Sequence, residues 1–354
     1  MNVIDTAQVP LWTMYLVFGV CAVAVWLAGT RLARYANVIA VKSGLGHVTV
    51  GMVLLGGITS LPEGAVSVFS AASGAPALAV NNLLGGVAMQ KALLAAVDGF
   101  IGRDALTVVS ASPILLLQAT LTMLLLVVAA FAIATGDFPL LGIGIGAWSL
   151  PALYLFSLWM ISRAQGRQPW VPREHPALRD AEATAAAREP QADPLHAASM
   201  RSLVLRTTAG GAVILVAGFF LSQAGEAIGT RTGLGLGFAG AVLLAFATSL
   251  PELSTVVSAM RLRQHEMAIS DILGTNLFNV ALIVLVDAVY AGPPVLGEAG
   301  VFSLGLALLG VLLTVIFLIG LIERRNRTIG RMGVDSFFIL LAYLGALFLL
   351  YQLR

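Results

Sequence analysis

The stretch GGITSLPEGAVSVF, residues 56–69, places Pro62 and Glu63 inside one of the most hydrophobic parts of the chain. Nearly the same string, AFATSLPELSTVVS, returns at residues 245–258 with Pro251 and Glu252. A proline interrupts an α-helix because it lacks a backbone N–H and its ring clashes with the preceding turn. An ionisable side chain within a membrane span is costly and is usually functional. The two strings therefore predict two broken membrane helices, each with a buried carboxylate.

Composition places the chain among polytopic membrane proteins. Hydrophobic residues make up 58% of its 354 residues and charged residues 11%, whereas about 25% of the residues of soluble domains are charged. Apolar runs of about 20 residues recur, long enough for helices that cross a bilayer core of about 30 Å, and a β-barrel would show short alternating segments instead. We expect an all-α protein with ten transmembrane helices, near residues 11–31, 44–73, 78–101, 107–134, 138–162, 203–226, 233–260, 266–291, 299–322 and 332–352.

The distribution of positive charge predicts the orientation of these spans. All but three of the 20 Lys and Arg residues lie in or beside the odd-numbered loops, the exceptions being Lys91, Arg231 and Arg354. Cytoplasmic loops are enriched in Lys and Arg, so we expect both termini outside the cell. The N-terminus has no basic stretch before its first apolar run, so we expect no cleaved signal peptide. Abundant Arg, Ala and Gly beside few Lys favour a bacterial source, and hence the cell inner (plasma) membrane.

The longest polar segment divides the chain into two halves. Residues 163–202 mix Pro, Ala, Glu, Asp and Arg without hydrophobic periodicity, which predicts a cytoplasmic linker. We expect an N-terminal five-helix repeat at 1–162 and a C-terminal one at 203–354. The linker has no EF-hand pattern, so we assign it no regulatory calcium site.

The two halves are internal repeats. Shifted by 189 residues, they align without a gap from Gly51 and Gly240 to Asp98 and Asp287. Each half has five predicted spans, an odd number, so the copies must enter the membrane in opposite directions. Inverted repeats with interrupted helices that meet near the bilayer midplane are typical of secondary transporters. We expect helices 2 and 7 to be the broken ones.

The repeated motif offers only oxygen atoms as ligands. Each glutamate has two hydroxyl residues three and four positions before it, on the same helical face if the turn is preserved. Two carboxylates, four hydroxyls and freed backbone carbonyls suit a hard cation such as Ca²⁺, whereas zinc or copper would require His or Cys. Two further oxygen-bearing residues, Thr275 and Asn279, share one face of the eighth span.

These motifs resemble the two α-repeats of the sodium/calcium exchanger family, within the calcium/cation antiporter superfamily. The second repeat is similar in ATSLPELSTVVSA and SDILGTNLFNVALIV, and the first in GGITSLPEGAVSVFSA. The resemblance implies a prokaryotic-type exchanger in which both glutamates and the adjacent threonines hold Ca²⁺, while serines, other side chains of spans 3 and 8 and carbonyls hold the coupling Na⁺. Carried over residue by residue, the implied ligands are Thr59, Ser60, Glu63, Thr248, Ser249, Glu252, Thr275 and Asn279.

The first repeat departs from the family pattern after Leu84, where it reads GGVAMQK. Gly86 stands at the position of Thr275, and Gln90, a longer amide, at that of Asn279. Lys91 follows near the middle of the third span. It either pairs with another polar group such as Asp98, sits deprotonated, or acts as a tethered cation that replaces a coupling Na⁺.

Other polar residues of the spans have structural interpretations. Asp98 and Asp287 lie symmetrically near helix ends, where capping or pairing is favoured over lining an ion entrance. Asn81, Asn82 and Asp271 open spans 3 and 8, and we expect them to cap those helices.

The leading functional prediction is a secondary active antiporter that exchanges Ca²⁺ for Na⁺ by alternating access. Exchange of Ca²⁺, or another divalent cation, for H⁺ is the alternative that Gln90 and Lys91 favour. A non-transporting membrane scaffold or sensor is a further alternative. No metalloprotease, nucleophile-elbow or nucleotide-loop motif is present, so we expect no enzyme and no cofactor. The expected partners are small inorganic cations and the lipid bilayer, with no nucleic acid and no obligate protein partner.

Overall fold

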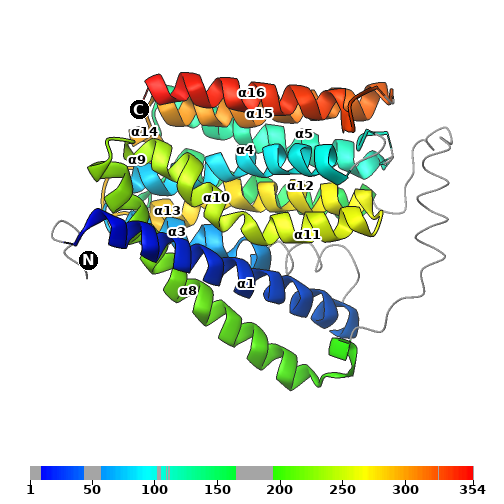
Figure 1. Cartoon of the computed structure of the whole chain (residues 1–354). Coiled ribbons are helices and arrows are strands. Elements are labelled where there is room, and N and C mark those ends of the chain that lie inside the picture. Colours follow the sequence, from blue (N-terminus) through cyan, green and yellow to red (C-terminus); the bar gives the residue numbers. More distant parts are fainter. Residues whose placement is uncertain are drawn as a thin grey trace.

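Long helices lying side by side make up most of the computed structural model, which describes residues 9–43, 57–101, 105–108, 110, 112–164, 194–325 and 327–353. In that part of the chain, eight helices are long and apolar enough to cross a membrane, or up to nine if one bent pair counts as a single span. The start of α1 and the end of α16 lie at the same end of the bundle (Figure 1). The described residues thus form an all-helical membrane architecture, apart from two short hairpins.

The described part of the first half contains five helices and one of those hairpins. In chain order the elements are α1 (Leu11–Ser43), α3 (Leu61–Ala72), α4 (Pro76–Ile101), α5 (Pro113–Thr135), β1 (Pro139–Leu140), β2 (Ile143–Gly144) and α6 (Ile145–Ala164). The predicted second span at 44–73 is described only from residue 57 onward, and its earlier part lies outside the described residues. Most of the predicted linker, residues 165–193, also lies outside them.

The second half repeats this order. After the short helix η1 (Pro194–Ala197) come α8 (Met200–Arg231), α9 (Leu236–Phe238), the π-helix η2 (Ala239–Leu244), α10 (Ala245–Thr248), α11 (Leu250–Arg261), α12 (His265–Ala281), α13 (Ile283–Val289), α14 (Val295–Glu298), α15 (Val301–Glu323), β3 (Thr328–Ile329), β4 (Met332–Gly333) and α16 (Val334–Gln352). Helices α1, α3, α4 and α6 start 189 residues before α8, α11, α12 and α16, and the two hairpins keep the same offset. The repeat therefore extends over the whole of each half.

Both SLPE motifs distort their helices in the same way. Ser60 and Ser249 have nearly identical backbone angles, φ −81° and ψ 6° against φ −83° and ψ 3°, outside the helical run. Each is followed by a helix that has proline in its first turn, where the missing N–H is tolerated. Around Ser249 the axis bends by 48° between residues 236–248 and 250–261.

The hairpins correct two predicted helix starts. The apolar runs predict helices from residues 138 and 332, but the chain first forms the antiparallel pairs β1–β2 and β3–β4, and α6 and α16 begin only at Ile145 and Val334. The first turn places Leu141 and Gly142 at φ 56° and 84°, conformations incompatible with a right-handed helix. Strands of two residues leave no alternating pattern in the sequence, which explains the error.

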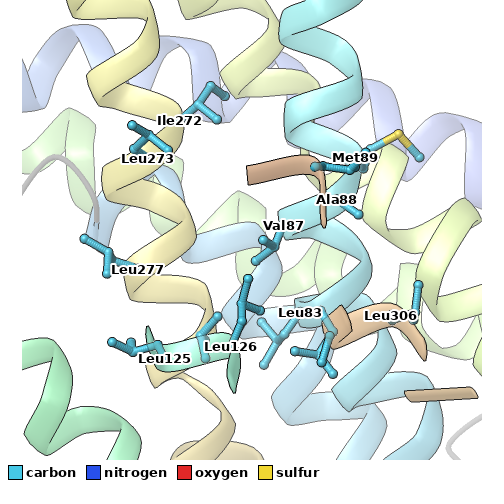
Figure 2. Close-up of a cluster of buried hydrophobic side chains, with 14 of the residues drawn as sticks. Leu83, Val87, Ala88, Met89, Leu125, Leu126, Ile272, Leu273, Leu277 and Leu306 are labelled. Carbon is cyan, nitrogen blue, oxygen red and sulfur yellow. The ribbon is translucent and has the colours of Figure 1, made fainter. Parts of the chain in front are cut away.

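Helices α4 and α12 form the centre of the bundle. Leu83, Val87 and Met89 of α4 and Leu273 and Leu277 of α12 belong to one buried apolar cluster (Figure 2). By contrast, only 22% of the most apolar window of α1, and the same share of α8, is buried, and these two helices pack extensively on each other. The structure thus has a buried core, with α1 and α8 as a peripheral pair.

Candidate cation-binding site

The two glutamates of the repeated motif lie in the first turns of α3 and α11. Both side chains are 0% exposed. The start of a helix carries a partial positive charge and unpaired backbone N–H groups, so it stabilises a carboxylate placed there. The proline that breaks each helix thus also creates the helix start on which its glutamate sits.

Contacts between the halves bring these glutamates into one site. Helix α10 of the second half packs against α3 and α4 of the first, and α11 packs against α4. The Gln90 amide nitrogen lies 3.5 Å from Glu63 Oε1. Glu252 is close enough to Glu63 for the two like charges to repel each other. The structure therefore places α3, α4, α10 and α11 around a common pair of carboxylates.

Hydroxyl groups of the site keep oxygen lone pairs available. Thr248 donates its proton to the carbonyl of Leu244 at 3.0 Å, and Thr275 to that of Asp271 at 2.8 Å. A hydroxyl has one proton and two lone pairs, so these bonds leave both oxygens able to face a cation. Thr59, Ser60 and Ser249 are also completely buried.

Many buried polar atoms here have no hydrogen-bond partner among the described residues. They are Ser60 Oγ, Glu63 Oε2, Gln90 Oε1, Ser249 Oγ, both carboxylate oxygens of Glu252, and the side-chain oxygens and nitrogens of Asn276 and Asn279. Buried polar groups are normally hydrogen-bonded, so such a concentration requires an explanation, and an ion is one. The oxygen atoms fit a hard cation. In the described part of the chain, no three His, Cys, Asp or Glu side chains converge as a metal cluster, so any such site depends on neutral oxygens beside the carboxylates.

The eighth span contributes one residue that the sequence prediction omitted. Asn276 follows Thr275 and is 0% exposed, with both of its side-chain polar atoms unpartnered among the described residues. The Gly-Thr-Asn string at residues 274–276 was the feature of the sequence that could have indicated this residue. Across from α12, a Cβ atom on Gly86 would lie 3.8 Å from Asn279 Nδ2. Gly86 of the first half therefore lies beside Asn279 of the second half, with room for a small side chain between them.

Lys91 points elsewhere. Its ammonium donates to the Val87 carbonyl at 3.3 Å, and the side chain is 3% exposed. It borders a small apolar cavity whose other walls come from α12, α15 and α16 and from Leu106. Among the described residues no ion pair joins Lys91 to Asp98, because the Asp98 carboxylate binds the backbone N–H of Gly333 instead.

A second layer holds the main chain of each glutamate. Asn82 donates to the Glu63 carbonyl at 3.3 Å and to Ser67 Oγ at 3.0 Å. In the other half Thr255 Oγ1 lies 2.9 Å from the Glu252 carbonyl and 2.6 Å from Asp271 Oδ2. The expectation that Asn81, Asn82 and Asp271 cap helices is wrong, because α4 and α12 begin five or six residues before them.

Comparisons with known proteins identify the family and the fold. The family model described as "Sodium/calcium exchanger protein" matches residues 13–163 and 202–352. A comparison with curated proteins gives no significant match. Among solved structures, the H⁺/Ca²⁺ exchanger CAX shares 13% identity over 98% of this chain and 86% of its own, with a TM-score of 0.69. Native YfkE shares 14% identity over 95% of this chain and 92% of its own, with a TM-score of 0.61. The sodium–calcium exchanger NCX_Mj shares 16% identity over 94% of this chain and 97% of its own, with a TM-score of 0.58.

Fold and motifs together define a membrane transporter of the cation antiporter class and not an enzyme. The chain belongs to the sodium/calcium exchanger family, within the calcium/cation antiporter superfamily, as its two SLPE repeats predicted.

Proposed function

We propose that the protein exchanges Ca²⁺ for Na⁺ by alternating access at a midplane site built on Glu63 and Glu252. The observation that carries the proposal is the pair of fully buried carboxylates, three of whose four oxygens have no hydrogen-bond partner among the described residues. Burying two like charges is costly unless a cation compensates them. The ligand set comprises Thr59, Ser60, Gln90, Thr248, Ser249, Thr275 and Asn279 beside the glutamates.

The mechanism is competition for these oxygens. A dehydrated Ca²⁺ bridges both carboxylates, and coupling cations displace it by neutralising the same charges. In this proposal the protein has ten spans, and helices 2 and 7 are the broken ones. Both termini lie outside the cell, the protein resides in the inner membrane, and residues 163–202 link the two five-helix repeats.

Alternating access requires a part that moves against the site, and α1 with α8 is suited to this. Both helices are largely exposed and pack on each other. They cross the motif helices at equivalent glycines, since a Cβ on Gly29 would lie 2.5 Å from Pro251 Cγ and one on Gly218 would lie 3.0 Å from Ala65 Cβ. Glycine at both crossings lets the helices approach closely, because α1 and α8 present no side chain of their own there.

Exchange of Ca²⁺ for H⁺ is the second candidate. It is favoured by Gly86, which removes a hydroxyl ligand, and by Gln90, whose amide hydrogen-bonds Glu63 itself. Lys91 adds a fixed cation to the same span; if its long side chain turns to the site, it replaces one coupling Na⁺. Similarity in fold to both an H⁺/Ca²⁺ exchanger and a sodium–calcium exchanger is compatible with either coupling ion.

The deciding experiment is Ca²⁺ flux into proteoliposomes under an imposed Na⁺ gradient or an imposed pH gradient. We expect flux driven by the Na⁺ gradient and abolished by Glu252→Gln. Flux driven only by the pH gradient would select the H⁺-coupled alternative. Absence of flux under both gradients would favour a non-transporting scaffold or sensor.

A further inference from the structure

Asn82 and Asp271 occupy the same position in the two halves, 189 residues apart, but only Asp271 is charged. Each lies in the second turn of its helix, beside the broken helix of its own half. Equivalent positions of the two halves therefore carry a neutral amide in one and a carboxylate in the other, and this difference requires an explanation.

In the first half a neutral amide is sufficient. The Asn82 side-chain nitrogen donates to the carbonyl of Glu63 and to the hydroxyl of Ser67, so it fixes the start of α3 without any charge. In the second half a carboxylate cannot donate to the carbonyl of Glu252. The hydroxyl oxygen of Thr255 lies 2.9 Å from that carbonyl and 2.6 Å from Asp271 Oδ2, and its single proton is shared between these two acceptors. Support of the main chain therefore does not explain why residue 271 carries a negative charge.

The position of that charge indicates its role. Asp271 is partly exposed, whereas Glu252 is 0% exposed and neither of its carboxylate oxygens has a hydrogen-bond partner among the described residues. Thr255 Oγ1 contacts both the main chain of Glu252 and the carboxylate of Asp271, so the two acidic residues lie side by side and their charges repel each other. A hard cation that interacts with both removes this repulsion and supplies the missing partner of Glu252.

We propose that Asp271 is a further cation-binding carboxylate, which receives the transported cation on its way to Glu252. This inference rests on the proposed function. In this inference the cation contacts Asp271 with Glu252 first and the Glu63–Glu252 pair afterwards. The second position lies deeper than the first.

The inverted repeat makes this feature one-sided. Asp271 lies between Glu252 and the turn joining α11 to α12, which the positive-inside rule assigns to the cytoplasm. The equivalent residue near the outer face is the neutral Asn82. Asp271 therefore raises the apparent affinity for Ca²⁺ from the cytoplasmic side alone.

The test is the concentration dependence of Ca²⁺ uptake in right-side-out and inside-out vesicles, with Ca²⁺ as the only divalent ion. Asp271→Asn installs the residue of the other half and preserves the acceptor for Thr255. We expect the half-saturating Ca²⁺ concentration to rise about tenfold when the cytoplasmic face is exposed to Ca²⁺, with the maximal rate and the opposite face changed less than about twofold. Asp271→Glu retains the charge and should remain close to wild type.

Thr255→Val tests a positioning role, because it removes both contacts of the Thr255 hydroxyl, to Asp271 and to the Glu252 carbonyl, and leaves the charge of residue 271. An effect of Thr255→Val equal to that of Asp271→Asn would assign Asp271 to a positioning role and overturn the inference. Unchanged half-saturation in Asp271→Asn would also overturn it while leaving the proposed function intact. If the wild-type protein carries no Ca²⁺ flux, the proposed function is refuted, and this inference with it.

Discussion

The carboxylate of Asp98, near the end of α4, accepts a hydrogen bond from the backbone N–H of Gly333, which lies in the hairpin of the opposite half, at 2.9 Å. Its repeat partner Asp287 does the same for Gly144, at 2.7 Å. Each half therefore secures the hairpin of the other. These crossed bonds join α4 and α13 to the hairpins before α16 and α6, so they tie the central helices of the two halves together.

Asp98→Ala should destabilise the protein by about 1–3 kcal/mol, because it leaves the N–H of Gly333 buried without an acceptor. Asp98→Asn keeps an acceptor oxygen and should lose less. Thermal unfolding of the purified protein in detergent measures both. Glu323→Ala is the control, since Glu323 is 51% exposed and surface substitutions change stability by less than about 0.5 kcal/mol. Equal effects of Asp98→Ala and Glu323→Ala would contradict a stabilising role for the crossed bonds.

Much of this architecture was predictable from the SLPE motif. Proline positions the breaks, and the offset between Glu63 and Glu252 gives the repeat register, which the helix starts of both halves follow. The equivalent positions of Asp98 and Asp287 in the two repeats were visible in the sequence as well. Their partners were not, because the acceptor–donor pair joins a side chain to a backbone N–H 235 residues away, and backbone groups leave no trace in residue types.

The surroundings of the candidate site residues were less predictable from the sequence than the residues themselves. Helical spacing places Thr275 and Asn279 on one face, but it does not reveal that Gly86 opens space beside Asn279. Nor does it show which way a long side chain turns from a central helix. Gln90 and Lys91 are adjacent, yet one reaches Glu63 and the other an apolar cavity.

Glu63→Gln and Glu252→Gln should each reduce Ca²⁺ flux about 100-fold or more. Removing one of two charges around a desolvated ion costs about 3 kcal/mol or more. In Ca²⁺-free buffer the same variants should unfold at an equal or higher temperature than wild type, because a buried repulsion is relieved. Thermal scans with and without Ca²⁺ therefore separate binding from folding. Glu298→Gln, at an exposed position of α14, is the control, and retained flux in either site variant would argue against the two-glutamate site.

Gly29→Ala should slow transport and destabilise the protein by about 1–3 kcal/mol, because the new methyl group would overlap the Pro251 ring at 2.5 Å. Gly19 is the matched control on the same helix, since nothing lies within 4 Å of a Cβ at that position. Gly19→Ala should be neutral or stabilising by up to about 1 kcal/mol. Transport rates and thermal unfolding of the two variants check this, and equal behaviour would exclude a close crossing of α1 over Pro251.

Gly86→Ser should restore a hydroxyl ligand opposite Asn279 and strengthen the Na⁺ dependence of Ca²⁺ flux. The substitution fits, since the Cβ would lie 3.8 Å from Asn279 Nδ2. Combined with Gln90→Asn, it restores two of the three family residues that the first half lacks, since Val87 still stands at the position of Asn276. The half-saturating Na⁺ concentration measures the effect and should fall about threefold or more, as expected for one added oxygen contact of about 0.7 kcal/mol. Gly345→Ser, in open space on α16, controls for the added hydroxyl, and an unchanged Na⁺ dependence would show that position 86 does not face the ion.

Lys91→Met separates the two roles that remain for this lysine. If its ammonium replaces a coupling ion, the variant loses one fixed positive charge and should take up one more monovalent cation for each Ca²⁺ exchanged. The reversal potential of Ca²⁺ flux in proteoliposomes reads this stoichiometry directly. Methionine suits the apolar cavity that the lysine borders, so the variant should fold, and Lys91→Arg should keep the wild-type stoichiometry. A reversal potential unchanged by Lys91→Met would assign Lys91 to packing against α15 and α16, where its ammonium binds only the carbonyl of Val87 among the described contacts.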